Sequence, residues 1–117
     1  MFVRSDSEFD RARAALGAAN LSCHVLDDST PAKPGHVSVS TMHRAKGLEF
    51  RAVAVLACDD EIVPLQQRIE SVTDEADLEE VYNTERHLLY VACTRARDRL
   101  WVSGMAPISE FLDDLAN

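Results

Sequence analysis

A polar segment between two apolar runs carries most of the side chains that could do chemistry. It spans residues 40–50, with the sequence Ser-Thr-Met-His-Arg-Ala-Lys-Gly-Leu-Glu-Phe. The apolar runs at 37–40 and 52–57 predict a strand on each side of it. In an open α/β sheet, ligands bind just past the carboxyl ends of the strands. A hydroxyl, an imidazole, cations, a flexible glycine and a carboxylate therefore lie where a ligand-binding loop is expected.

A second segment places two arginines on a predicted helix. Residues 85–96 have the sequence Glu-Arg-His-Leu-Leu-Tyr-Val-Ala-Cys-Thr-Arg-Ala. Arg86 and Arg95 are nine residues apart, so at 100° per residue they point to opposite sides of the helix. We expect Arg86 to form a structural ion pair. Taken alone, Arg95 is explained by the favourable interaction of a cation with a helix C-terminus.

Together the two segments resemble a known family. The pattern T-x-H-x-A-K-G-L-E-F in residues 41–50 is similar to motif V of UvrD/Rep-type superfamily 1 helicases, and residues 85–96 resemble its motif VI, E-R-R-L-x-Y-V-x-x-T-R-A. The two occur in the family's order. Val3-Arg4-Ser5, before an amphipathic helix and a strand, is a weaker match to motif IV. The resemblance implies the C-terminal RecA-like (2A) motor domain of an ATP-dependent DNA helicase that moves 3′ to 5′.

The resemblance implies four residues of a nucleotide site. Arg95 would be catalytic, as an arginine finger that stabilises charge on the γ-phosphate. Arg4 matches a motif IV arginine that also reaches the γ-phosphate. Glu49 would accept a hydrogen bond from the ribose hydroxyl, and Gly47 would supply a positive φ or a close approach to the ligand. A solvated carboxylate at Glu49 and a surface arginine at Arg4 are the alternatives.

The resemblance also implies contacts with single-stranded DNA. Thr41 and His43 match positions that contact the DNA backbone, and their side chains suit phosphate oxygens without reading sequence. A core or capping histidine is the alternative for His43. Lys46 could serve either phosphate or protein packing. His87 stands where the family commonly has a second arginine, which weakens any ligand role there.

Part of an ATP site is missing from the sequence. None of the glycines, at 17, 35, 47 and 104, begins a G-x-x-x-x-G-K-[ST] phosphate loop. No metal site is predicted, and we interpret Asp59-Asp60-Glu61 as an acidic loop. The resemblance implies that ATP and Mg²⁺ are held mainly by a missing N-terminal RecA-like domain, so the isolated fragment should be inactive. A non-catalytic RecA-like binding module and the motor domain of a helicase-nuclease remain alternatives.

Charge limits what the isolated chain can bind. The net charge is −8, but residues 59–85 carry ten acidic side chains and one basic one. Residues 41–51 have a net charge of +2 and residues 86–99 of +3. Because the overall electrostatic field repels phosphate, we expect the isolated domain to bind single-stranded DNA weakly. We also expect it to be a monomer. The resemblance implies a 3′-tailed duplex as the substrate of the parent protein.

Three separate cysteines in apolar runs indicate reduced thiols. These thiols suit the cytoplasm, and no apolar run reaches membrane-spanning length. Together with the resemblance, this implies a cytoplasmic, bacterial protein.

Periodicity and turn residues predict one domain over residues 1–117. Ser5-x-x-Glu8 indicates a capping box and Asn20 a helix stop. The predicted strands are 2–3, 22–26, 37–40, 52–57 and 100–103, and the predicted helices are 6–19, 65–72, 78–95 and one from Pro107. The order of these elements predicts an α/β fold, a parallel sheet of about five strands flanked by helices. The resemblance implies that this sheet is RecA-like (P-loop NTPase-type), lacking its own Walker A motif.

The motif segments divide this domain. The motif IV-like segment covers 2–20, motif V covers 37–57 and motif VI covers 85–100. A large 2B insertion separates motifs IV and V in UvrD-like helicases. At about 27–36 this chain has only a short polar loop, so the insertion is either naturally absent or has been removed.

Overall fold

Five parallel strands form a single open sheet. The computed structural model describes residues 1–27 and 32–113. The strands lie in the order β2-β3-β1-β4-β5, and each pairing is parallel. The prediction of an α/β fold with about five parallel strands is therefore confirmed. The strands are β1 (Phe2–Val3), β2 (Cys23–Val25), β3 (Val37–Thr41), β4 (Phe50–Val55) and β5 (Ala96–Val102).

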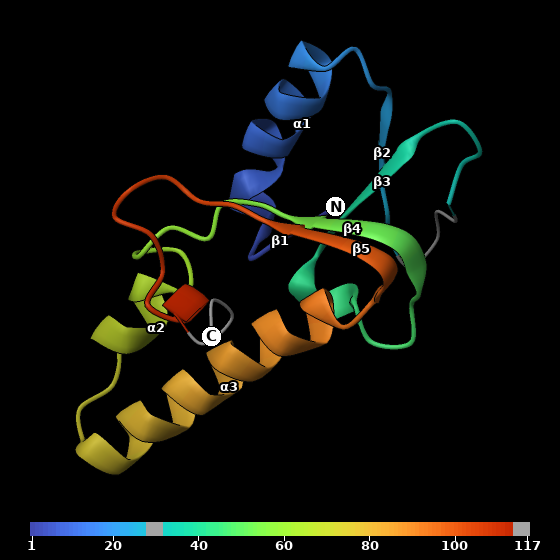
Figure 1. The fold of residues 1–117 in the computed structure, drawn as a ribbon. Helices are drawn as coiled ribbons and strands as arrows, with labels where there is room; N and C mark the ends of the chain where they lie inside the picture. The colour runs from blue at the N-terminus through green and yellow to red at the C-terminus, as the bar shows by residue number, and fades with distance from the viewer. Residues whose placement is uncertain (28–31, 114–117) are drawn as a thin grey trace.

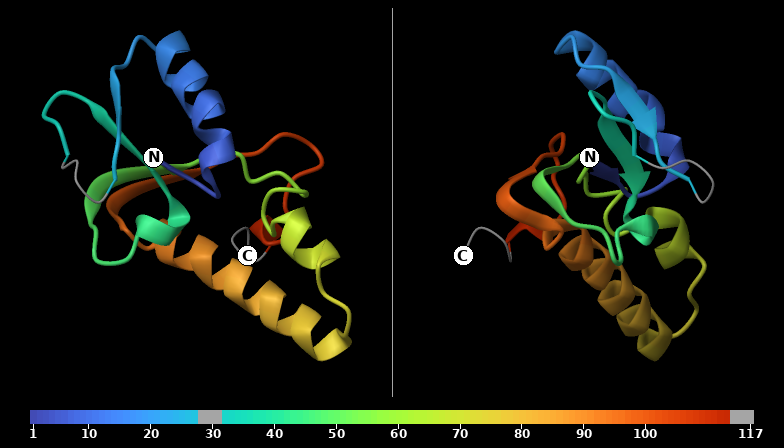
Figure 2. Two further views of the ribbon diagram at one scale, coloured as in Figure 1. Left: turned by 180° about the vertical axis from the view of Figure 1, so that it is seen from behind. Right: turned by 90° about the vertical axis from the view of Figure 1, so that its right-hand side faces the viewer.

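Helices cover both faces of this sheet (Figures 1 and 2). Helix α1 lies on one face, and α2 and α3 lie on the other. The α-helices that cover the sheet are α1 (Phe9–Ala18), α2 (Gln66–Glu70) and α3 (Glu75–Cys93), with short 3₁₀ helices η1 (Asp6–Glu8) and η2 (Met42–Arg44). The N-cap Asp74 begins α3, because its carboxylate accepts a hydrogen bond of 2.8 Å from the Asp77 amide. The predicted start of this helix, residue 78, was three residues too late.

The core is divided between the two faces. Successive residues of a strand point to opposite faces, so Phe2 packs with the α3 side and Val3 with the α1 side. The smaller cluster joins Val3 and Val39 to Ala12 and Leu16 of α1. The larger cluster lies between the sheet and α3 and contains the following buried residues: Phe2, Met42, Ala45, Val53, Val55, Cys58, Val63, Leu89, Ala92, Cys93 and Phe111.

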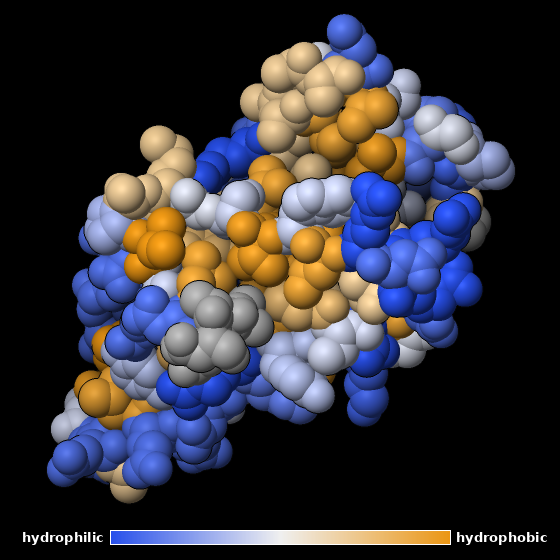
Figure 3. All heavy atoms as spheres, viewed as in Figure 1, coloured by the Kyte–Doolittle hydropathy of each residue, from blue (hydrophilic) through white to orange (hydrophobic). Residues whose placement is uncertain are grey.

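The edge strand β5 is the least covered strand of the sheet. Leu100 and Trp101 are exposed on it. Figure 3, in the same orientation as Figure 1, shows apolar side chains gathered near the middle of this face and bordered by hydrophilic residues. Strand β5 begins at Ala96, four residues before the predicted start, because α3 ends at Cys93. The chain thus turns directly from the motif VI helix into the sheet.

Two local predictions were wrong. The Ser5 hydroxyl makes no capping bond; the Glu8 amide donates instead to the Ser5 carbonyl at 3.0 Å, which tightens the start into η1. No helix begins at Pro107, because the backbone there pairs with the chain around Asp59. Ile108 forms an antiparallel bridge with Asp59, and the Asp60 amide donates to the Pro107 carbonyl at 3.0 Å. Helical residues begin only at Leu112, and the later part of the predicted helix, 114–117, lies outside the described residues.

Candidate functional site

The end of β1 and the end of β3 meet at one edge of the sheet. Val3 and Thr41 are register partners, so Arg4 follows β1 directly beside the last residue of β3. The 3₁₀ helix η2 then carries His43. Thr41 is buried, whereas His43 is exposed. The structure thus brings Arg4, Thr41 and His43 to the carboxyl edge of the sheet, where the sequence predicted a ligand-binding loop.

Arg4 is held in a buried ion pair with Glu85 of α3. Its Nε and NH2 atoms donate to the two carboxylate oxygens at 2.8 and 2.7 Å, which is the bidentate geometry of a strong arginine–carboxylate pair. The side chains are 5% and 0% exposed, respectively. Arg4 is therefore an interior cation rather than the surface arginine that was its alternative.

Glu85 also gathers two groups from the α2 region. Its Oε1 accepts from the Leu65 amide and its Oε2 from NH1 of Arg68, both at 2.8 Å. Burial alone would raise the pKa of Glu85, but hydrogen bonds from Arg4 and the Leu65 amide lower it below the ordinary value. The buried carboxylate is thus ionised and has hydrogen-bond donors on both oxygens.

His43 connects this cluster to the surface. Its Nε2 lies 2.9 Å from NH1 of Arg4. Desolvation, together with the positive charge of Arg4, lowers the pKa of His43. The neutral imidazole is favoured at neutral pH, so His43 acts here as an acceptor for a buried arginine and not as a second cation.

A second group of predicted residues lies at the C-terminal end of α3. The guanidinium of Arg95 donates from Nε to the Val91 carbonyl at 3.1 Å and from NH1 to the Leu48 carbonyl at 3.4 Å. The first bond is the interaction with helix carbonyls that was the alternative for this arginine. The second bond ties the end of the motif VI helix to the motif V loop, directly beside Glu49.

Glu49 faces solvent and has a cationic neighbour. Its carboxylate lies 3.5 Å from Nε of Arg97, and the two side chains are 66% and 54% exposed. Such an exposed pair is weak and leaves Glu49 free to exchange partners. Gly47 has a φ of 81°, so its predicted positive φ is confirmed. Lys46 is exposed in the same loop.

The two groups lie at different positions along α3: Glu85 is near the middle of the helix, and Arg95 follows its C-terminal end. Arg4 pairs with Glu85, and Arg95 follows ten residues later, which corresponds to about 15 Å along a helix. The guanidinium of Arg86 lies 4.8 Å from the centre of the Phe111 ring and donates from NH1 to Asn83 Oδ1 at 3.3 Å. These contacts agree with the structural role that was predicted for Arg86.

Glu85 is the functional candidate that sequence reasoning missed. It was placed at the start of motif VI without a role, because acidic side chains crowd this part of the chain. A signal was present: Glu85 falls at helical spacing with the buried residues Leu89, Ala92 and Cys93 of α3. A carboxylate in an otherwise apolar stripe needs a buried cation, and Arg4 supplies it.

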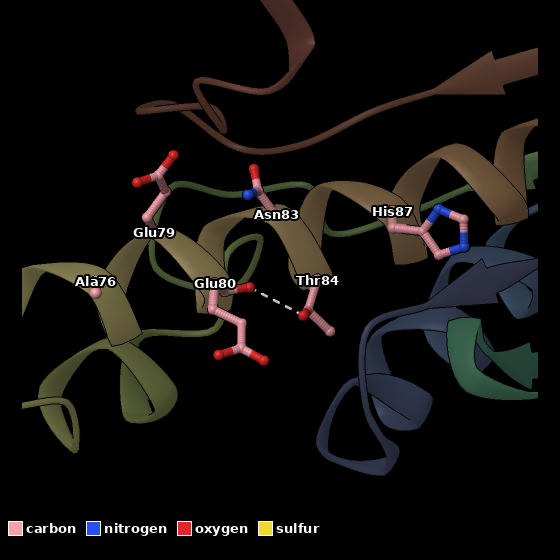
Figure 4. A pocket seen from close by; sticks show the side chains of 6 residues that line it. All are labelled: Ala76, Glu79, Glu80, Asn83, Thr84 and His87. Carbon is pink, nitrogen blue, oxygen red and sulfur yellow. Dashed lines mark hydrogen bonds between the residues drawn. The ribbon is translucent and has the colours of Figure 1, made fainter.

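The outer face of α3 has a different character. Figure 4 shows a hollow along this helix, where the Thr84 hydroxyl donates to the Glu80 carbonyl at 2.9 Å. The exposed carboxylates there would repel a phosphate, and none of the predicted site residues lines the hollow. Its lining residues are Ala76, Glu79, Glu80, Asn83, Thr84 and His87.

Metal and membrane features can be assessed over the described ranges. In residues 1–27 and 32–113, no three His, Cys, Asp or Glu side chains come together as a metal site. In the same ranges, the helices are too short or too polar to cross a bilayer.

The parallel sheet with helices on both faces defines an α/β fold of the RecA-like class, and comparisons with known proteins identify the family. Residues 12–106 match the family described as the UvrD-like helicase C-terminal domain. The chain belongs to this family. It also resembles the crystal structure of the C-terminal domain of a possible DNA helicase from Lactobacillus plantarum WCFS1, with a TM-score of 0.63 and 27% identity over 95% of this chain and 58% of that one.

Curated relatives agree with this assignment. The chain is 48% identical to YjcD of Bacillus subtilis (strain 168) over 69 residues, which cover 57% of this chain and 9% of that protein. It is 41% identical to the ATP-dependent DNA helicase UvrD1 of Mycobacterium tuberculosis over 69 residues, or 59% of this chain and 8% of that protein. The chain therefore spans less than a tenth of the length of these relatives.

Proposed function

We propose that this chain is the second motor domain of an ATP-dependent DNA helicase and supplies one wall of its ATP site. The observation that carries the proposal is the bond from Arg95 to the Leu48 carbonyl, because it joins motif VI to the motif V loop at one surface. At that surface, the guanidinium of Arg95 contacts the residue that precedes Glu49, whose carboxylate is exposed. These are the groups that a nucleotide's phosphates and ribose require.

Within this proposal, Arg95 acts on the γ-phosphate during its transfer. The bonds that hold it in this structure go to backbone carbonyls and to the Thr94 hydroxyl, at 3.1 to 3.4 Å. No carboxylate neutralises its charge among these partners, so the guanidinium keeps its attraction for an anion. Glu49 would exchange Arg97 for a ribose hydroxyl. Arg4 is the second candidate for the γ-phosphate, and it would first have to leave Glu85.

The donor set of the described chain suits a nucleotide but not its metal ion. Magnesium prefers carboxylates together with phosphate oxygens, and the carboxylates near the predicted residues, Glu49 and Glu85, are each paired with arginine. We propose that an N-terminal RecA-like domain holds Mg²⁺ and most of the ATP. The bound Mg²⁺ would neutralise charge on the transferring phosphate.

DNA contacts are proposed at the segment that follows β3, beside the Arg4–Glu85 pair. Thr41 and His43 would contact the backbone of single-stranded DNA, with Lys46 as an additional cation, and movement would be 3′ to 5′. The motif IV, V and VI segments are assigned to 2–20, 37–57 and 85–100. A short connection at 27–36, partly outside the described residues, would take the place of a 2B insertion.

The test is steady-state ATPase activity of the helicase polypeptide that carries this domain, with and without single-stranded DNA. Arg95→Ala should lower kcat by at least about 10²-fold with little change in nucleotide affinity, since the arginine acts on the transition state. Glu49→Ala should mainly raise KM, because the ribose does not change during chemistry. Arg99→Ala removes an exposed arginine of β5 and is the matched control. A kcat within a few-fold of wild type for Arg95→Ala would contradict the finger assignment.

The isolated chain gives a second test. It should hydrolyse no ATP, and it should bind single-stranded DNA no more tightly than about 10⁻⁴ M at physiological salt. The net charge of −8 opposes tighter binding. Nanomolar affinity would instead indicate a nucleic-acid-binding module that functions without a motor partner.

A further inference from the structure

An exposed histidine touches a buried arginine in this fold. His43 lies on the surface loop that follows β3, whereas Arg4 is almost fully buried. The two side chains meet through His43 Nε2 and Arg4 NH1, 2.9 Å apart. His43 is therefore the solvent-facing end of a chain of hydrogen bonds that continues inward from Arg4 to Glu85.

The direction of the outer bond fixes the state of the imidazole. A guanidinium has no acceptor, so NH1 of Arg4 donates and Nε2 of His43 accepts. The ring proton then lies on Nδ1. An exposed Nδ1–H can donate to a phosphate oxygen, so one neutral imidazole can bind Arg4 and a nucleic-acid backbone at the same time.

The inner end of the chain has more positive than negative charge. Arg4 and Arg68 share one carboxylate, and the Leu65 amide donates to the same carboxylate. Arg68 is 37% exposed and approaches from a different element. If Arg4 moves away, Glu85 keeps a cation and a backbone donor, so its buried charge remains compensated.

We propose that His43 is a positioning residue that transmits the binding of single-stranded nucleic acid to Arg4, and that Glu85 with Arg68 holds Arg4 in the buried position described above. This inference rests on the proposed function, since it assigns Arg4 to the nucleotide and His43 to the DNA. It adds a physical route between these ligands: His43 to Arg4 to Glu85.

Bond strengths give the direction of the effect. An anion that accepts from Nδ1–H raises the basicity of the opposite ring nitrogen, as a carboxylate does for a metal-bound histidine. A stronger bond from NH1 to Nε2 then draws the guanidinium toward His43 and away from Glu85, which holds it through Nε and NH2. Phosphate at His43 therefore loosens the Arg4–Glu85 pair and makes Arg4 available to a second anion, the γ-phosphate.

The test follows the Arg4 side chain by NMR in the 117-residue chain. The Nε–H of Arg4 donates to a buried carboxylate, so its signal should be protected from exchange. Titration with a short single-stranded oligothymidylate should shift this signal together with the backbone amides of the loop. His43→Gln keeps both an acceptor and a donor, so the Arg4 shift should persist; in His43→Leu it should disappear.

The matched control is His87→Leu, which removes an exposed histidine from the outer face of α3 and should leave the Arg4 shift unchanged (Figure 4). In the helicase polypeptide, His43→Leu should reduce the stimulation of kcat by saturating DNA about tenfold, and His43→Gln should restore most of it. Saturating DNA separates this loss from weaker DNA binding.

The outcomes separate the inference from the function beneath it. If the loop amides respond to DNA but the Arg4 signal does not, or if Arg4 responds equally in His43→Leu, the route through His43 is refuted and the proposed function stands. If the loop amides do not respond to DNA at all, the DNA contacts of the proposed function are refuted, and the inference with them.

Discussion

Replacing Glu85 by glutamine is the most informative single change in this domain. Glutamine has nearly the same shape but no charge, so it leaves Arg4 buried without a counter-ion. Breaking a buried ion pair by removing one partner costs about 3 to 5 kcal/mol, because the remaining charge is uncompensated. We expect Glu85→Gln to lower the free energy of unfolding by this amount.

The exposure of the two arginines decides where the cost arises. Arg68 is 37% exposed and can turn its guanidinium toward water, whereas the Arg4 side chain is 5% exposed and cannot. The cost is therefore that of one stranded cation. A domain of 117 residues has a total stability of about 6 to 18 kcal/mol, so the variant should remain folded but with a much reduced margin.

The assay is urea unfolding followed by far-ultraviolet circular dichroism. With a slope of about 2 kcal/mol per molar urea, the midpoint should fall by roughly 2 M. Glu80→Gln is the matched control, because Glu80 is an exposed glutamate of the same helix and should change stability by less than about 0.5 kcal/mol. The double variant Arg4→Met/Glu85→Leu removes both charges and should recover most of the loss.

Two results would refute this reasoning. One is a Glu85→Gln variant within about 1 kcal/mol of wild type, which would mean that Arg4 finds solvent without cost. The other is a double variant no more stable than the single one. That result would show that packing of the side chains, and not the unpaired charge, determines the effect.

The pH dependence provides an independent check on the same residue. The pKa of Glu85 is lowered in the folded state, so the unfolded chain takes up the proton first as pH falls. The contribution to stability is complete above the unfolded value, about 4.3, and is lost as pH falls through the folded value. Wild type should therefore lose more stability than Glu85→Gln between neutral and acidic pH.

Other predictions concern glycine and cysteine positions. Gly104→Ala should be strongly destabilising, by more than about 1 kcal/mol, since an added Cβ would lie 2.5 Å from the Cys58 carbonyl oxygen. Gly17→Ala, inside α1 with open space around it, should instead raise the free energy of unfolding by about 0.5 to 1 kcal/mol. Urea unfolding measures both changes. Burial raises the pKa of the Cys58 thiol to about 12, so a thiol reagent at neutral pH should label the half-buried Cys23 well before Cys58 in the native state.

Much of the architecture was predictable because it depends on local patterns. Apolar runs with polar ends located the strands, and helical spacing located α1 and α3. Asn20 has a φ of 58° and ends α1, as its type predicted. The missing capping bond of the Ser5 hydroxyl was not predictable from the local pattern, because the backbone carbonyl of Ser5 accepts from the Glu8 amide instead.

The candidate site was predictable as a set of residues but not as a set of contacts. Motif spacing selected Arg4, His43 and Arg95. The sequence did not indicate that Arg4 and His43 contact each other, whereas Arg95 bonds to backbone carbonyls elsewhere. Arg4 and His43 are 39 residues apart in the chain, and Arg4 and Glu85 are 81 apart. Contacts over such separations are determined by strand order, which local patterns do not specify.

The neighbours Glu85 and Arg86 show how helix geometry separates adjacent charges. They are about 100° apart around α3, so Glu85 turns toward the end of β1, whereas Arg86 turns toward the ring of Phe111. Each charge therefore contacts a distant part of the chain, and the two do not simply neutralise each other. This arrangement leaves the buried Glu85 carboxylate between Arg4 and Arg68, and a carboxylate shared by two cations is what would allow one of them to be released to another anion, as proposed above.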